Sequence, residues 1–203
     1  KIGSISARYL ITLDIDYAPD DFWDEYILEY EYEAVLYSTH KHGSGMPRFR
    51  LVMPLSREVL ADEYEAIARK VAGNLNIEYF DPTTFQPERL MFWPSISKDS
   101  QFYFQHQKGP WIDSDKVLEE YPDWRDSSLW PISEKSKKRI KEGIAKQEDP
   151  TAKGGVIGTF CRTYGIEEAI VKFIPEIYES TSYENKWTYT AGSTAAGMIV
   201  YDN

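Results

Sequence analysis

A short segment near the N-terminus, residues 9–16, most constrains the fold of this chain. It is mostly apolar, β-branched or aromatic, and it contains neither glycine nor proline, which predicts a β-strand. Side chains alternate between the two faces of a strand, so Leu13 and Ile15 point into the core. Asp14 and Asp16 then share the opposite face. The segment therefore predicts a sheet with one buried face and one polar face.

The segments that follow add helices and further strands. Residues 17–27 carry the proline and the acidic residues that open a helix, and residues 59–75 have apolar side chains at helical spacing. Further strands, the first two joined as a hairpin by a Gly-Ser-Gly turn, are predicted at residues 33–40, 47–55, 89–95 and 101–107. This order predicts an α+β fold: an RRM-like or ferredoxin-like antiparallel sheet with helices on one face and one added strand.

The pattern changes after about residue 125. Residues 134–147 predict a basic, polar helix. Beyond it, two short helices broken at Gly165 and a hairpin over residues 186–202 are expected. We therefore predict a catalytic domain, a polar helix with a linker, and a small, mostly helical C-terminal module, at residues 1–125, 126–155 and 156–203.

Charge, cysteine content and hydropathy exclude several classes of protein. A formal charge of −10 and a pI near 4.9 argue against a protein coated with nucleic-acid-binding cations, although they leave room for a local basic groove. Cys161 is the single cysteine, so a reducing cytoplasm is the expected compartment. No apolar run approaches the roughly 20 residues that span a bilayer, so no membrane partner is expected.

The two aspartates of the first strand are the first candidate for a functional site. Carboxylates about 6 to 7 Å apart on one sheet face repel each other unless a positive group lies between them. Hard divalent cations such as Mg²⁺ take oxygen ligands, and paired carboxylates suit a two-metal site for phosphoryl transfer. A solvated strand end whose acids face water also explains Asp14 and Asp16.

The next two strands carry cationic candidates. The second strand ends with Ser38 and His40 on one face, and Arg48 and Arg50 share a face of the third. Across a short hairpin these groups lie close enough to hold a triphosphate, because guanidinium forks match phosphate oxygens. The alternatives are an ordinary polar histidine and an exposed strand face.

A third candidate lies in residues 76–95. Asp81 ends a short apolar run, and Arg89 opens the next predicted strand. If these strands are neighbours in the sheet, Asp81 is a third metal ligand. Taken alone, the pair Asp81 and Pro82 is an equally good turn opener.

Three motifs in this order, "LDID", "YSTH" and "YFDPTTFQPERLMFWP", resemble the archaeo-eukaryotic primase superfamily over roughly residues 8–125. The resemblance is greatest to the primase-polymerase domains of phages and mobile elements. It implies that Asp14, Asp16 and Asp81 are catalytic and ligate two Mg²⁺ or Mn²⁺ ions. It implies nucleotide binding by Ser38, His40, Lys41, Arg48, Arg50 and Arg89.

The same resemblance sets expectations for activity and partners. It implies template-directed nucleotidyl transfer, with single-stranded DNA as template and nucleoside triphosphates as substrates, in the cytoplasm of a bacterial host. A helicase domain is expected on the same full-length chain. Relatives carry more residues before the first motif, and this chain starts at Lys1 and ends within a predicted strand. We therefore expect it to be a piece of a longer polypeptide whose catalytic domain is shortened at the N-terminus.

Two other functions remain open on the sequence. A rolling-circle or relaxase nuclease would use His40 and His42 as metal ligands, with Tyr64 or Tyr79 as the nucleophile. A non-catalytic RRM-like module would bind single strands through aromatic side chains such as those of Tyr103 and Phe104.

Overall fold

The computed structural model describes residues 5–43, 45–145, 149–192 and 195–200. The chain divides into two compact units, one of residues 1–124 with 130–134 and the other of residues 125–129 with 135–203. Within the described ranges, no helix combines the length and the apolar character that crossing a bilayer requires.

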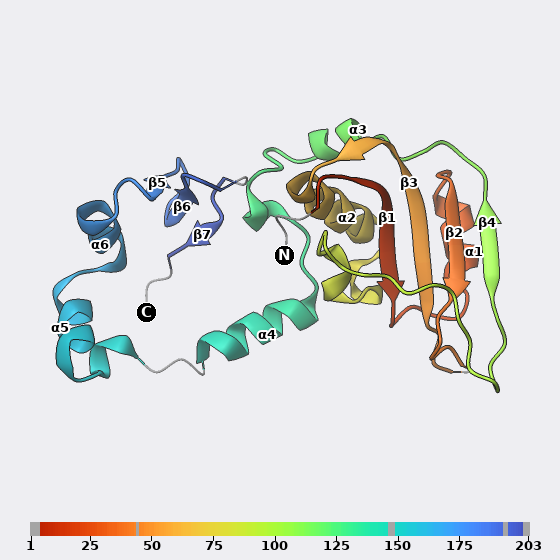
Figure 1. Ribbon diagram of the computed structural model, residues 1–203, viewed down its shortest axis with the longest axis horizontal. Coiled ribbons are helices and arrows are strands. Elements are labelled where there is room, and N and C mark those ends of the chain that lie inside the picture. The colour runs from red at the N-terminus through yellow and green to blue at the C-terminus, as the bar shows by residue number, and fades with distance from the viewer. Residues whose placement is uncertain (1–4, 44, 146–148, 193–194, 201–203) are drawn as a thin grey trace. The chain divides into compact units, whose positions relative to one another are not determined.

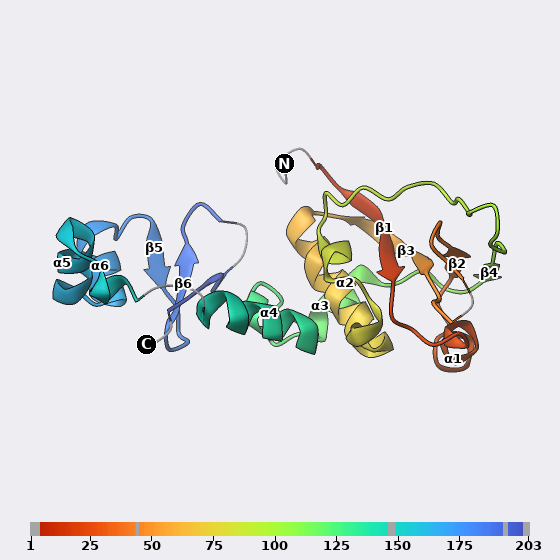
Figure 2. The ribbon, with the colours of Figure 1, turned by 90° about the horizontal axis from the view of Figure 1, so that it is seen from below.

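The first unit is built on a four-stranded antiparallel sheet (Figure 1). Its strands, in the spatial order β1-β3-β2-β4, are β1 (Arg8–Ile15), β3 (Phe49–Val59), β2 (Ala34–Ser38) and β4 (Phe104–Gln107). Figure 2 shows the helices α1 (Phe22–Glu29) and α2 (Ala61–Leu75) on one side of the sheet and the segment 87–103 on the other. The predicted α+β class, with an antiparallel sheet and helices on one face, is confirmed.

The core forms between the apolar face of the sheet and the apolar faces of the amphipathic helices. Ile11, Leu13 and Ile15 of β1 are fully buried, and Leu13 lies opposite Leu51 of β3. The helices cover this face with large side chains, namely Phe22, Trp23, Tyr26, Tyr64, Ile67 and Val71. Each such side chain contributes about 1.5 to 3 kcal/mol when it is fully buried. The opposite face is therefore left open and polar, as the sequence of β1 predicts.

The topology differs from a complete ferredoxin-like arrangement at the fourth strand. β3 lies between β1 and β2, as in a split βαβ unit, but β4 pairs with β2. The strand predicted at residues 89–95 does not form. Two prolines, Pro87 and Pro94, flank or interrupt that segment and cannot donate a backbone hydrogen bond to a sheet. The short helix α3 (Ser114–Glu119) was not predicted.

The free edge of β1 is occupied by the turns that follow α2, η2 (Ile77–Tyr79) and η3 (Pro82–Phe85). The backbone N–H of Asp81 donates to the carbonyl of Asp14 at 3.0 Å. The Thr84 hydroxyl accepts from the N–H of Asp14 at 3.0 Å and donates to the carbonyl of Thr12 at 2.9 Å. These bonds use the polar groups that another strand would need, so β4 pairs at the opposite edge.

The second unit combines helices with a small sheet. Its elements are η4 (Ser127–Leu129), α4 (Glu134–Ala145), η5 (Pro150–Ala152), α5 (Gly155–Thr163), α6 (Ile166–Phe173), β5 (Tyr178–Ser180), β6 (Lys186–Tyr189) and β7 (Met198–Ile199). The break at Gly165 and the β6–β7 hairpin are confirmed. The predicted helices form, and β5 adds a third strand to the predicted hairpin. Gln147, at the predicted end of the basic helix, and residues 201–202 of the predicted hairpin lie outside the described residues.

The Thr84 hydroxyl gives a first prediction. Thr84→Val leaves two backbone groups of β1 without their partner, so we expect the free energy of unfolding to fall by about 1 to 3 kcal/mol in urea denaturation. Thr83→Val is the matched control, because the Thr83 hydroxyl is buried and has no hydrogen-bond partner among the described residues. We expect the control to change stability by less than about 0.5 kcal/mol. Equal losses in the two variants would contradict the role of Thr84.

Asp126 gives a prediction for the second unit. Its fully buried carboxylate accepts from the Ser128 N–H at 3.0 Å and from the Lys186 ammonium at 3.1 Å. Burial raises the pKa of Asp126, but the hydrogen bonds from Ser128 and Lys186 outweigh it, and the pKa lies below its ordinary value. The stabilisation is therefore present above the unfolded pKa, about 3.9, and is lost as the pH falls through the lower folded value.

We expect Asp126→Asn to lower the stability of this unit by about 1 to 3 kcal/mol at pH 7. The difference from wild type should shrink as the pH falls below about 4. Denaturation followed by the indole N–H NMR signal of the buried Trp187 measures both values. A difference that stays constant from pH 7 to pH 2.5 would show that the carboxylate charge is not responsible.

A candidate nucleotide-binding pocket on the open sheet face

One row of side chains crosses the open face of the sheet. Asp14 of β1 is in register with Arg50 of β3, Arg50 with Tyr37 of β2, and Tyr37 with Phe104 of β4. Residues directly opposite each other on neighbouring strands project from the same face. A carboxylate, a guanidinium, a phenol and a phenyl ring therefore lie side by side on the face that the helices leave open.

Arg50 is the centre of this row. It is 7% exposed, and its guanidinium donates to Asp14 Oδ1 at 2.6 Å, to the carbonyl of Phe92 at 2.6 Å and to the Tyr37 hydroxyl at 3.4 Å. Burial lowers the pKa of Arg50, but the hydrogen bonds and charges of Asp14 and Tyr37 raise it more, so that the pKa lies above its ordinary value. Arg50 therefore stays charged, and it ties the segment 87–103 to the sheet.

A second arginine–aspartate pair lies next to this row. Arg48 Nη1 is 2.5 Å from Asp16 Oδ1, and the two side chains are 22% and 30% exposed. The Arg48 guanidinium also lies over the ring of Tyr17, at 5.7 Å from its centroid. Asp14 and Asp16 thus each pair with an arginine, and Arg48 and Arg50 line the same pocket, although Arg48 lies just before the first residue of β3.

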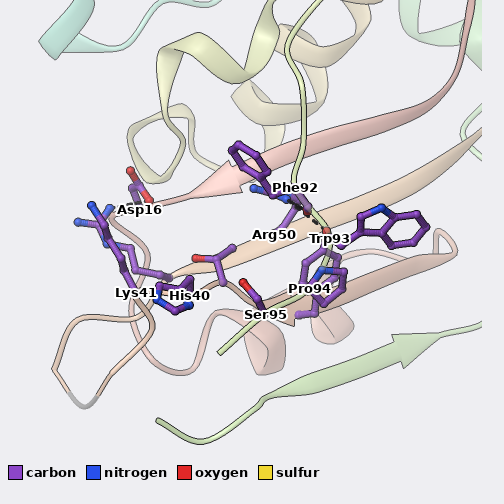
Figure 3. Close-up of a pocket in the computed structure, with 11 residues that line it drawn as sticks. Asp16, His40, Lys41, Arg50, Phe92, Trp93, Pro94 and Ser95 are labelled. Carbon is purple, nitrogen blue, oxygen red and sulfur yellow. Dashed lines mark hydrogen bonds and ion pairs between the residues drawn. The ribbon is translucent and has the colours of Figure 1, made fainter. Parts of the chain in front are cut away.

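Both arginines, together with Asp16 and Tyr37, line a pocket of about 700 Å³ (Figure 3). Its lining residues are Asp16, Tyr37, Thr39, His40, Lys41, Arg48, Arg50, Phe92, Trp93, Pro94 and Ser95. Figure 3 shows the labelled Asp16, His40 and Lys41 at one side and Phe92, Trp93 and Pro94 at the other. Three cations against one carboxylate leave the lining with a formal charge of +2, whereas the whole chain carries −10. The pocket therefore joins an anion-attracting side to an aromatic side.

The third predicted metal ligand, Asp81, has a different arrangement. Its Oδ1 accepts from the Thr83 N–H at 2.9 Å, which caps η3, and its own N–H is bonded to the carbonyl of Asp14. The turn-opening role that the sequence also allows is the one this carboxylate performs. Across the ranges that the structure describes, no three histidine, cysteine, aspartate or glutamate side chains are grouped so as to hold a metal ion.

The donor chemistry of Asp14 and Asp16 nevertheless suits a hard cation. Asp14 supplies carboxylate oxygens from β1 and Asp16 from the bend that directly follows it, and each is already paired with a guanidinium, that of Arg50 or of Arg48. These guanidinium groups are internal stand-ins for a positive ion. The carboxylates therefore fit a divalent cation, provided that an arginine gives up its place.

The predicted nucleotide-binding residues fall into two groups. His40 and Lys41 are exposed and line the pocket. Ser38 is fully buried, and its hydroxyl accepts from the Tyr103 N–H at 2.9 Å, on the core side of β2 with Leu36. The expected shared face of Ser38 and His40 is wrong, because β2 ends at Ser38 and His40 lies in the following turn. Arg89 is exposed and lies outside the pocket lining.

The residues required by a nuclease do not converge. His42 accepts from the Arg48 N–H at 3.1 Å and packs on Phe49, with ring centroids 4.8 Å apart, so it serves the hairpin turn. Tyr64 is fully buried beneath Arg8, and Tyr79 packs against the core. Neither tyrosine is placed as a nucleophile beside His40.

Several pocket residues were not predicted from the sequence. The position of Tyr37 could have been predicted from strand alternation, because it points to the face opposite the buried Leu36 and Ser38. Thr39, Phe92, Trp93 and Pro94 lie within the quoted motifs, but no role was predicted for their side chains. Phe92 and Trp93 were assigned to a strand, although consecutive aromatics followed by Pro94 break the alternation that a half-buried strand requires.

Arg50 gives a prediction for the pocket wall. Arg50→Lys keeps the charge but loses the planar fork that reaches Asp14 and the Phe92 carbonyl together. We expect trypsin to cleave at Arg89 and Lys98 about tenfold faster, because the segment 87–103 opens more often. Arg48→Lys is the matched control, since the Arg48 pair with Asp16 does not involve that segment. Equal cleavage in both variants would contradict the anchoring role of Arg50.

Comparison with known proteins gives the chain its family. No curated protein and no solved structure matches it. The family model of the VapE N-terminal domain matches residues 1–133, which cover the open-faced sheet and its pocket. VapE-like proteins are replication proteins of phages and mobile elements. The chain therefore belongs to the VapE N-terminal domain family.

Proposed function

We propose that the first unit is a template-directed nucleotidyltransferase, a primase-polymerase acting within a phage or mobile-element replication protein. One observation carries the proposal: a pocket that joins cations to an aromatic wall includes Asp16 in its lining and lies beside the Asp14–Arg50 pair of the open sheet face. A nucleoside triphosphate has the matching parts, a polyanionic tail and a flat base. The volume of about 700 Å³ lies within the range of small-molecule sites.

The cationic side of the pocket is suited to the triphosphate. Lys41 and His40 are exposed at the turn after β2, and Arg48 follows in the turn before β3. Their N–H groups donate charge-assisted hydrogen bonds to phosphate oxygens, and the Arg48 fork can grip two oxygens at once. In this proposal Arg50 positions the wall and leaves phosphate binding to the more exposed groups.

The aromatic side is suited to the base. The side chains of Phe92 and Trp93 are 75% and 90% exposed at the pocket, an unusual exposure for such large apolar groups. Stacking on a base removes this apolar surface from water and tolerates any base. This tolerance fits an enzyme whose template selects the nucleotide.

The carboxylates are suited to the chemistry. Two divalent cations would activate the 3′-hydroxyl of the primer and stabilise the departing pyrophosphate. Asp16 and the carboxylate oxygen of Asp14 that Arg50 does not occupy would hold them, and Asp81 would join them by releasing the Thr83 N–H. The protein otherwise positions the substrates and stabilises charge, because nucleotidyl transfer requires no covalent bond between protein and substrate.

A second candidate function is single-strand binding without catalysis. Of the two aromatics predicted for this role, Phe104 is about half exposed and stacks with Phe102, with ring centroids 6.4 Å apart, whereas Tyr103 packs against the core. Such a pair can stack on unpaired bases. In the enzyme the same pair would contact the template, so measurement of nucleotide incorporation separates the two candidates.

Asp16 provides the test of the enzyme. Asp16→Asn removes the more exposed carboxylate of the pair and leaves the buried Asp14–Arg50 interaction in place. We expect incorporation of labelled nucleotides on a primed single-stranded template to fall by at least about 100-fold. The reason is that the reacting centre loses a charged ligand of the divalent cation. Circular dichroism should show an unchanged fold.

Asp20→Asn, at an exposed carboxylate outside the pocket lining, is the control and should retain full incorporation. Unchanged incorporation in Asp16→Asn would remove the catalytic assignment. A wild-type protein that binds single strands tightly and never incorporates nucleotides would favour the second candidate.

A further inference from the structure

Two arginine–aspartate pairs of the same chemistry differ in how firmly they are held. The Arg50 and Asp14 side chains are 9% and 17% exposed, and Arg50 is also bonded to the Phe92 carbonyl. The backbone of Asp14 is fixed on its other edge by Thr84 and Asp81. Moving this guanidinium would leave a buried charge without a partner and release the pocket wall, which is costly.

The other pair is free of these constraints. The Arg48 and Asp16 side chains are 22% and 30% exposed, and both line the pocket. The recorded contacts of the Arg48 side chain are Asp16 and the face of Tyr17. Ion pairs this open to solvent contribute little net free energy, about 0.2 to 1 kcal/mol. Separation of Arg48 from Asp16 is therefore inexpensive when each finds another partner of opposite charge.

Two different ligands can supply these partners. A divalent cation satisfies Asp16, and a phosphate group satisfies Arg48. Either ligand alone must break the pair and leaves one charged side chain without its partner. Both ligands together satisfy both side chains, so each lowers the cost of binding the other.

We propose that Asp16 and Arg48 form an exchange pair, in which Arg48 occupies the place of a divalent cation until a phosphate-bearing ligand draws it away, while Arg50 stays on Asp14. The inference rests on the proposed function, since it assigns a regulatory role within the same pocket. It makes metal and nucleotide binding reciprocally coupled, each tightening the other by the same factor. When both ligands are present, Asp16 binds the cation and Arg48 binds the phosphate.

Titration of Mn²⁺ without nucleotide tests the metal half of the exchange. Arg48→Gln removes the internal cation, so we expect the mutant to bind Mn²⁺ about two- to fivefold more tightly than wild type. Lys41→Gln is the matched control: it removes a pocket cation for which no carboxylate partner is recorded among the described residues. We expect a gain of at most about twofold there, from the loss of one solvent-screened charge.

Titration of inorganic triphosphate in the presence of EDTA tests the phosphate half. Asp16→Asn frees Arg48, so we expect about two- to fivefold tighter binding than in wild type. The double variant with Arg48→Gln has no guanidinium to free, and we expect this gain to disappear. If triphosphate bound more tightly only because a negative charge was removed, Asp16→Asn would tighten binding with or without Arg48. The double variant therefore distinguishes this charge effect from the release of Arg48.

The outcomes distinguish this inference from the proposed function. If wild type binds Mn²⁺ and triphosphate but Arg48→Gln gains no more than Lys41→Gln, the exchange is overturned and the nucleotide pocket stands. Persistence of the Asp16→Asn gain in the double variant overturns it equally. If wild type and every variant fail to bind either ligand, separately and together, both the exchange and the proposed function are overturned.

Discussion

The buried guanidinium of Arg50 determines the arrangement of the open sheet face. A charge with 7% exposure must be paired, and Arg50 is bonded to Asp14, the Tyr37 hydroxyl and the Phe92 carbonyl. These partners come from β1, from β2 and from the irregular segment before β4. One side chain therefore joins β1, β2 and the loop that crosses the sheet, and that loop supplies the aromatic wall of the pocket.

The charge distribution follows from this arrangement. The pocket lining carries a formal charge of +2 within a chain of −10, so its cations are concentrated where the aromatic wall begins. An acidic body repels a polyanion in general, while a local basic pocket directs the phosphates of a nucleotide to one place. This pattern agrees with a domain from replication proteins. It also explains why the net charge of the whole chain was a poor guide to what the pocket can bind.

Local sequence patterns predicted much of the first unit and less of the site. The strand alternation around Leu13, the hairpin and helix α2 depend on neighbours in the chain, so they were predictable. Ser38 was assigned to the pocket face of β2, although it lies two residues after Leu36 and therefore shares the core face with it. The segment with Phe92 and Trp93 was misassigned because its course depends on a distant arginine. The sheet in the second unit was underestimated because β5 has three residues.

The sequence by itself determined which face of β1 is polar and which residue types reach it, because side chains of a strand alternate with a period of two. The tertiary structure decided which charges meet. Asp14 and Asp16 could equally have faced water, a metal ion or a cation of the protein, and the β1–β3 register placed Arg50 opposite Asp14. Periodicity is a property of adjacent residues, whereas the partner of a charge depends on which distant strand lies beside it and in which register.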